Sequence, residues 1–196
     1  MKKIFSTIAI VASLSLGLLG CIKNDPVVFT DVQAELDATS WNANAAGLTY
    51  PIIGRIPGYG RVANTTDSTL RRFPQTVRIR VNLLGSQVTK SETLGYELFS
   101  SPITSFSMPA TIAGQTPAAA AGALTVSDAV AGTHFAPLSG TLTFNSGSSF
   151  AFIDVTILNP GPTAGAGRFL GIRLNNNGSI KRALNYSELG LVIDQR

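Results

Sequence analysis

Residues 76–84 read Thr-Val-Arg-Ile-Arg-Val-Asn-Leu-Leu, and this stretch decides the fold class. Apolar side chains occupy every second position from Val77 to Leu83, and arginine or asparagine fills the positions between them. Because successive side chains of a strand point to opposite faces, the apolar residues share one face and the polar residues share the other. The stretch therefore predicts a half-buried strand of an antiparallel sheet.

Six further segments have the composition of short strands. Each is rich in Val, Ile, Leu, Phe and Thr, and Gly, Pro, Asn or Ser separates one from the next. They cover residues 94–99, 124–127, 140–145, 150–158, 169–174 and 189–194. In the fourth we expect Ile153, Val155 and Ile157 to face the core. Seven strands spaced by turn residues predict an all-β, antiparallel β-sandwich.

Composition excludes several classes of protein. With 196 residues, 13% charged and 19 glycines, the chain suits neither a coiled coil nor a disordered tail. One cysteine and one histidine exclude an internal disulfide, a thiolate metal cluster and a multi-histidine zinc site, so we expect no metal and no cofactor. Of 15 basic residues, Lys2 and Lys3 lie in the leader described next, which leaves 13 against 11 acidic residues. That balance predicts no nucleic-acid partner.

The first 21 residues begin with Lys2 and Lys3, continue with apolar and small residues, and end in Leu-Leu-Gly-Cys. This order is typical of a secretory signal peptide. The placement of Cys21 resembles the lipobox of bacterial lipoproteins, which implies that residues 1–20 are removed and that the Cys21 sulfur is acylated. An ordinary signal peptide or an uncleaved anchor is the alternative. Residues 21–26 then form a short tether, and the chain is anchored to the membrane through lipid.

Lys23 and Asp25 follow the cysteine closely. This arrangement is similar to the surface-export signal of some Bacteroidota lipoproteins. The resemblance implies an outer-membrane location, on the periplasmic face or at the cell surface.

Two regions are less regular than the predicted strands. Residues 27–74 hold candidate strands within 27–36 and 48–53, and we expect them to pack on the sandwich because so short a segment does not sustain its own core. Residues 100–122 contain three prolines and the run Ala118–Ala121, and we expect a flexible flap or a loop that contacts a partner.

Three motifs occur in order within residues 75–196: Ala-Gly-Thr-His-Phe at 131–135, Ser-Gly-Thr-Leu-Thr-Phe at 139–144, and Ile-Asp-Val-Thr-Ile at 153–157. They resemble the Calx-beta module, and Leu-Val-Ile-Asp at 191–194 resembles its final strand. With the lipobox, the chain looks like the small Calx-beta-like lipoproteins of Bacteroidota, which implies an Ig-like sandwich and no assigned activity. Calcium-binding Calx-beta modules use clustered carboxylates, whereas residues 159–167 contain none, and Asp128 and Asp154 are isolated.

The sequence predicts that the protein is not an enzyme. His134 is the one imidazole, and we expect a turn or strand-edge histidine there rather than a catalytic base. Cys21 is expected to be lipidated, and nothing in the sequence brings two carboxylates together for hydrolysis.

Four residues are candidates for ligand or partner contact: Arg78, Arg80, Trp41 and Tyr59. The two arginines share a strand face, which either is simply solvated or binds an acidic glycan, a lipid headgroup or a protein. Ser68, within Asp-Ser-Thr, resembles a short O-glycosylation signal. The aromatic side chains that could stack on sugar rings, with core packing as the default reading, are Trp41, Tyr50, Tyr59, Tyr96 and Tyr186.

These observations predict a lipid-anchored structural or partner-binding module of the cell envelope. The alternatives are a glycan-binding accessory lipoprotein of an outer-membrane uptake system and a calcium-dependent, adhesin-like module.

Overall fold

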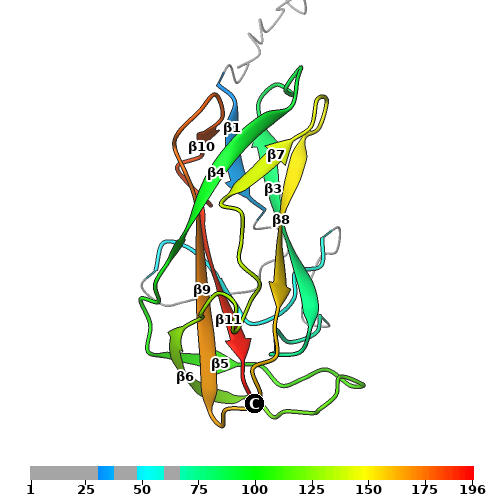
Figure 1. Cartoon of the computed structure of the whole chain (residues 1–196), viewed down its shortest axis with the longest axis vertical. Coiled ribbons are helices and arrows are strands. Elements are labelled where there is room, and N and C mark those ends of the chain that lie inside the picture. The colour runs from blue at the N-terminus through cyan, green and yellow to red at the C-terminus, as the bar shows by residue number, and fades with distance from the viewer. Residues whose placement is uncertain (1–30, 38–47, 60–66) are drawn as a thin grey trace, which may run out of the picture.

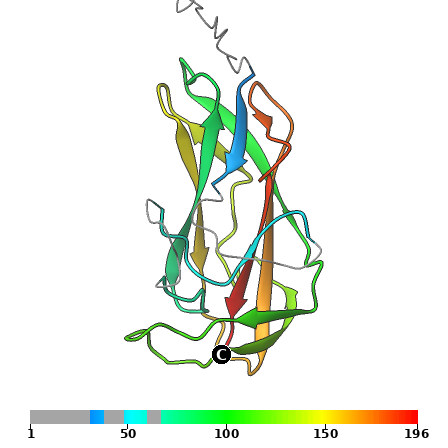
Figure 2. The ribbon, with the colours of Figure 1, turned by 180° about the vertical axis from the view of Figure 1, so that it is seen from behind.

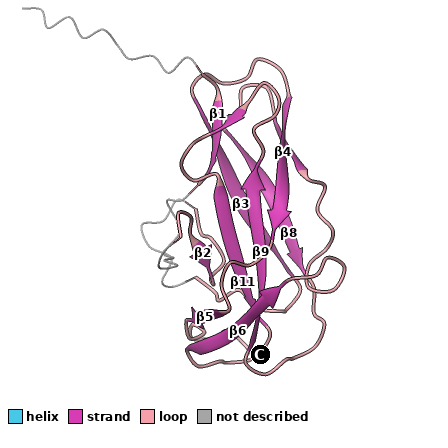
Figure 3. Ribbon diagram, turned by 90° about the vertical axis from the view of Figure 1, so that its left-hand side faces the viewer, coloured by secondary structure: helices cyan, strands magenta, loops and turns pink. Residues whose placement is uncertain are grey.

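The computed structural model describes residues 31–37, 48–59 and 67–196, and all regular secondary structure within them is β-strand (Figure 3). Cys21 and Trp41 lie outside these ranges. The strands are β1 (Gln33–Leu36), β2 (Ile52–Ile53), β3 (Gln75–Leu84), β4 (Glu92–Phe99), β5 (Ser105–Met108), β6 (Gly122–Asp128), β7 (Thr141–Phe144), β8 (Phe150–Ile157), β9 (Ala166–Leu174), β10 (Lys181–Arg182) and β11 (Glu188–Asp194).

The strands form two sheets. One has four strands in the order β10-β1-β3-β8. The other has seven strands: β2-β11-β9-β4-β7 form its main path, β6 also pairs with β9, and β5 pairs with β6 (Figure 1). The prediction of an all-β sandwich is confirmed.

The alternation that predicted the first strand is present in the structure. Side chains of β3 and β8 alternate between buried and accessible positions, and the two strands pair in register with Ile79 opposite Ile153. The residues expected to face inward are each at most 8% exposed: Val77, Ile79, Val81, Leu83, Ile153, Val155 and Ile157. Apolar burial between the sheets is thus the main stabilising term of the fold.

Three strand pairs correct the prediction of a purely antiparallel sandwich. β1 pairs with β10, β2 with β11, and β6 with β9, and all three pairs are parallel. The partners in the first two pairs lie far apart in the chain, so a long connection returns the second strand in the same direction. Period-two alternation reveals which side chains share a face and says nothing about strand direction.

Residues 100–122 contain a strand and a side chain bonded to a distant segment. β5 lies within them and pairs antiparallel with β6. Beyond β5, the side chain of Gln115 accepts hydrogen bonds from the backbone N–H (3.1 Å) and hydroxyl (2.8 Å) of Thr69 and donates one to its carbonyl (2.9 Å). The Gln115 side chain thus takes the place of a neighbouring strand for Thr69. A flexible flap or a loop that contacts a partner stays a prediction for residues 100–122.

The two ends of the described chain lie at opposite ends of the molecule. β1 begins at one end, and the C-terminus lies at the other, as both views of the ribbon show (Figures 1 and 2). The strands of both sheets lie between these two ends.

Candidate functional site

The structure brings three of the predicted contact residues together on the outer surface of the four-stranded sheet. The guanidinium of Arg78 lies 4.3 Å from the ring centre of Phe152, and that of Arg80 lies 4.6 Å from the ring centre of Phe150. The Tyr59 ring is tilted against Phe152 at 6.5 Å. We call these five residues the arginine–phenylalanine face. Arg78 and Arg80 alternate along β3, and the two phenylalanines alternate along β8, so strand pairing places each arginine beside an aromatic ring.

Carboxylates partly compensate the two arginines. Arg78 Nε donates to Asp154 at 2.9 Å, and Arg80 Nε lies 3.4 Å from Asp37. The Arg78 pair is well exposed, so it contributes little to stability. The face is therefore an ordered arginine–aromatic surface rather than a free cationic patch.

Tyr59 has a specific structural partner. Its hydroxyl accepts a hydrogen bond from the backbone N–H of Arg80 at 2.7 Å. β1 pairs with β3 only as far as Val81, so the N–H of Arg80 lies just beyond the end of β1. The tyrosine hydroxyl fills the place of the missing strand partner.

Ser68 is half-buried beside buried Asp67. The carbonyl of Ser68 accepts a hydrogen bond from the N–H of Ile56 at 2.9 Å. Its O-glycosylation stays a prediction. The predictions for Cys21 and Trp41 fall outside the described residues.

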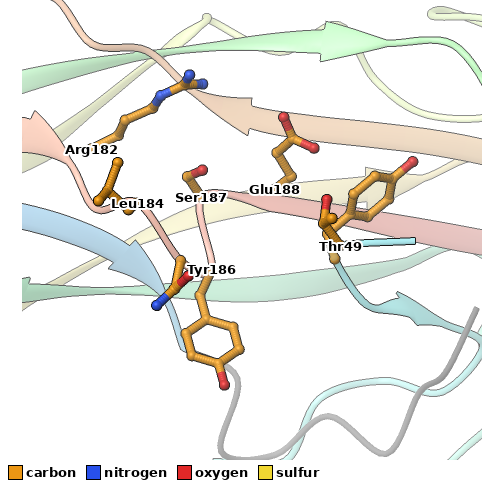
Figure 4. Close-up of a pocket in the computed structure, with 8 residues that line it drawn as sticks. Thr49, Arg182, Leu184, Tyr186, Ser187 and Glu188 are labelled. Atoms are coloured by element: carbon orange, nitrogen blue, oxygen red, sulfur yellow. The ribbon is translucent and has the colours of Figure 1, made fainter. Parts of the chain in front are cut away.

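A second site lies beside the connection between β10 and β11. It is a cavity of about 620 Å³, which we call the Arg182 pocket (Figure 4). Its lining residues are Thr49, Tyr50, Arg182, Leu184, Asn185, Tyr186, Ser187 and Glu188. In Figure 4, Arg182 and Glu188 extend to the same side of the chain with Ser187 between them, and Tyr186 points the other way.

Backbone hydrogen bonds hold the connection in place. The N–H of Ala183 donates to Ala34 (2.8 Å), the carbonyl of Tyr186 accepts from Leu36 (2.7 Å), and the carbonyl of Ser187 accepts from Leu174 (2.9 Å). Between these anchors, Leu184 is 99% exposed. The wall of the pocket is thus attached to both sheets.

The charges that line the pocket differ in their partners. Glu188 accepts a 2.6 Å hydrogen bond from Arg173, which also bonds Glu97 at 3.1 Å. Arg182 makes one long contact, 3.5 Å to the carbonyl of Leu174. Among the described residues no carboxylate pairs with Arg182. Within the described residues, the pocket therefore presents Arg182 without a carboxylate partner, beside Glu188, which shares Arg173 with Glu97.

Tyr50 is fixed on the opposite wall. Its ring packs edge-on against Phe99, with centroids 5.3 Å apart. Burial raises the pKa of the Tyr50 hydroxyl, and the charge of Glu188 acts in the same direction. Tyr50 is thus neutral near pH 7 and able to donate a hydrogen bond.

Sequence reasoning found part of this pocket. Tyr50 and Tyr186 belong to the aromatic set considered for sugar stacking, and the fold places both at one cavity, whereas Tyr96 is buried. Arg182 and Glu188 were missed because no motif in residues 182–188 marks them as a site. Only the fold brings this stretch against Thr49 and Tyr50.

His134 lies in the turn that precedes Phe135. Gly132 has a φ of 78°, and its N–H donates to the carbonyl of Phe135 at 2.8 Å, so this turn uses a conformation that glycine adopts without a steric penalty. His134 is 7% exposed, and its Nδ1 accepts the N–H of Val130 at 2.9 Å. Burial lowers the pKa of His134, and the charge of Arg168 lowers it further. The imidazole has the geometry of a structural turn histidine.

Within the part of the chain that the structure describes, no three His, Cys, Asp or Glu side chains are grouped closely enough to hold a metal ion. The same residues include no helix with the length and apolar character needed to cross a membrane.

No family model matches the sequence, and a search of curated proteins finds no match. Among solved structures, the apo form of the Calx CBD1 domain is similar over 85% of this chain and 99% of its own, with a TM-score of 0.44 and 14% identity. CBD12 from CALX1.2 is similar over 60% of this chain and 36% of its own, with a TM-score of 0.39 and 18% identity. For the calcium binding domain CBD12 of CALX1.1 the shares are 62% and 40%, with a TM-score of 0.38 and 16% identity. The class of this protein, an all-β sandwich, follows from its own strand pairing.

Proposed function

We propose that this protein is a non-enzymatic, lipid-anchored binding module of the bacterial outer membrane. The observation that carries the proposal is the arginine–phenylalanine face, where Arg78, Arg80 and Tyr59 lie together beside Phe150, a phenylalanine that is 41% exposed. Arginine and aromatic residues are enriched at the centres of protein interfaces and supply most of their binding energy. Their mutual stacking orders the side chains before a partner arrives, which lowers the entropic cost of binding.

The leader supports the anchored location. Cys21 follows Leu-Leu-Gly, and the acyl chains that a lipobox implies provide more than the two hydrophobic signals needed for stable membrane attachment. β1 begins at one end of the sandwich, so a tether joined there leaves the sheet faces accessible to a partner (Figure 1).

The anchor is tested by replacing Cys21 with serine. We expect the wild-type chain to fractionate with membranes and to carry a mass increase of acyl chains at Cys21. Cys21→Ser should move the protein into the soluble fraction. An unmodified thiol in membrane-bound wild type would reject the lipoprotein assignment.

The binding surface is tested by photo-crosslinking in intact cells. A benzophenone amino acid placed at Phe150 should give a discrete crosslinked product, and the same amino acid at Thr143, exposed on the other sheet, should not. Arg78→Gln should reduce the product at Phe150. Equal products at both positions, or none at Phe150, would reject this face as the partner surface.

A glycan-binding accessory lipoprotein is the second candidate function. Tyr50 at a polar cavity favours it, since tyrosine offers both an apolar ring and a hydroxyl to a sugar.

A further inference from the structure

We infer that the Arg182 pocket binds a carboxylate-bearing saccharide, a uronic acid unit of an acidic glycan, and that Arg182 holds its carboxylate. This inference rests on the glycan-binding candidate function and names its site and ligand class. It does not depend on the lipid anchor or on the arginine–phenylalanine face.

The first argument is the size and shape of the cavity. Its volume of about 620 Å³ falls within the roughly 300–1,000 Å³ typical of small-ligand sites. Its walls come from the segment before β2 and from the connection between β10 and β11, so the site exists only in the assembled sandwich.

The second argument is the charge balance. Arg173 already satisfies Glu188 at 2.6 Å, so that carboxylate is poorly suited to hold an ammonium group. To the described residues, Arg182 makes only its long contact with the carbonyl of Leu174. A guanidinium binds a carboxylate through two parallel hydrogen bonds, which makes an anion the natural partner of this arginine.

The third argument is the chemistry of the remaining lining. Thr49, Asn185 and Ser187 offer short hydroxyl and amide groups, and the carboxylate oxygens of Glu188 accept hydrogen bonds. These groups match a ligand that carries several hydroxyls. A uronic acid combines several hydroxyls with one carboxylate, so it fits both features of the lining.

The fourth argument is the stored backbone strain at the site. Tyr186 has a φ of 54°, and among the described residues it is the one non-glycine residue with a positive φ. Such a conformation costs free energy and persists at sites that the surrounding structure holds in place. Here hydrogen bonds to β1 and β9 supply that support, so the pocket wall is ordered before ligand binds.

The experiment measures binding by calorimetry, with the full-length chain in detergent micelles. The probes are an oligogalacturonate, the same oligomer with its carboxyl groups reduced to alcohols, and polyglutamate as a polyanion without sugar. We expect the oligogalacturonate to bind about tenfold more tightly than the reduced oligomer, and polyglutamate to bind more weakly than either.

Arg182→Gln should weaken oligogalacturonate binding about tenfold and leave the reduced oligomer unaffected, which removes the preference. Lys90→Gln is the control, since Lys90 is a cation that is 81% exposed and lies outside both proposed sites, and it should bind like wild type. Unchanged melting temperatures of both variants establish that they are folded.

The alternative outcomes separate this inference from the function on which it rests. If the reduced oligomer binds as tightly as the oligogalacturonate, or if Arg182→Gln keeps the preference, the acidic site is wrong while glycan binding stands. If polyglutamate binds as well as the oligogalacturonate, the site does not recognise a saccharide. If neither oligomer binds to wild type, the glycan-binding function falls together with the inference.

Discussion

Tyr186 shows how a single residue can be held against its own backbone preference. A side chain in the left-handed region costs about 1–2 kcal/mol because its Cβ approaches the backbone, and glycine avoids that cost. Tyr186 is 50% exposed, so little packing compensates the strain. The backbone is held there by the Leu36 N–H, which donates a 2.7 Å hydrogen bond to the carbonyl of Tyr186.

We predict that Tyr186→Gly raises the free energy of unfolding by about 0.5–1 kcal/mol, measured by urea denaturation. The control is Asn185→Gly, at an exposed neighbour without a positive φ, which should destabilise slightly through the added chain entropy. Equal destabilisation by the two substitutions would show that Tyr186 is not strained.

Also at the scale of a single residue, His134 should make the free energy of unfolding depend on pH. Burial holds the folded-state pKa of His134 below its ordinary value of 6.5, so the unfolded chain binds more protons between the two values. Its contribution to stability is fully present above pH 6.5 and is lost as the pH falls toward the folded-state pKa.

Urea denaturation at several pH values tests this dependence. The free energy of unfolding should fall between about pH 7 and pH 5 more steeply in wild type than in His134→Asn. The asparagine oxygen accepts the N–H of Val130 without titrating. Parallel curves for the two proteins would contradict the prediction.

At the scale of elements, the end of β11 is tied by a buried charge cluster. Asp194 is 1% exposed and bonds the Arg196 side chain at 2.9 Å, and Arg71, 2% exposed, lies 4.0 Å from it. Arg71 also donates to the carbonyls of Pro117 and Arg196. The cluster joins β11 to the segments before β3 and before β6.

Asp194→Asn should cost about 3–5 kcal/mol, because it leaves the buried guanidinium of Arg71 without a counter-charge. Asp154→Asn removes the carboxylate of an exposed pair and should cost less than about 1 kcal/mol. Urea denaturation of both variants makes the comparison. Similar losses of unfolding free energy would mean that the buried charge of Arg71 does not need Asp194 as its counter-charge.

β9 is the central strand of the larger sheet. At Gly171 it comes very close to Phe99 of β4. A Cβ at this position would lie 2.6 Å from the carbonyl oxygen and 2.7 Å from the ring of Phe99. Gly171 pairs with Phe99 across β4 and β9, and the Phe99 ring in turn supports Tyr50 in the Arg182 pocket.

We predict that Gly171→Ala lowers stability by about 1–3 kcal/mol through overpacking, seen as a lower melting temperature. Gly95→Ala on β4 is the control, since its Cβ would meet the mobile end of the Asn175 side chain at 2.9 Å. The Gly95 variant should melt close to wild type. If Gly95→Ala melts at a lower temperature than Gly171→Ala, close packing against Phe99 does not determine the cost of a side chain at Gly171.

At the scale of the whole molecule, strands near the N-terminus are part of both sheets. β1 pairs with β3 and β10, and β2 pairs with β11. The fully or nearly fully buried apolar residues before β3 are Ala34, Leu36, Ile52, Ile53 and Leu70.

A chain that begins at residue 75 should not unfold cooperatively. Burial of each Leu or Ile side chain contributes about 1.5–3 kcal/mol, and the total stability of a domain is only about 5–15 kcal/mol. The truncation also exposes the edges of β3 and β11, which favours aggregation. A sharp thermal transition near that of the full chain would instead make residues 75–196 an autonomous domain.

The sequence by itself determined the all-β class, the positions of seven strands and the face that each of β3 and β8 turns to the core. This was possible because the alternation of apolar and polar side chains along a strand can be read from a short stretch of sequence. For these seven strands, the predicted ends differ from the observed ones by at most three residues, at the start of β9, whereas β5 and β10 were not predicted.

Only the tertiary structure decided which strands are neighbours. The parallel pairs of β1 with β10 and β2 with β11 join residues that are remote in sequence, and nothing local encodes their direction. The same assembly buried Arg71 against Asp194, and it set Arg182 beside Glu188 with no ion-pair partner in the described part of the chain. The pocket joins residues 182–188 to Thr49 and Tyr50, and only long-range pairing brings these two segments together.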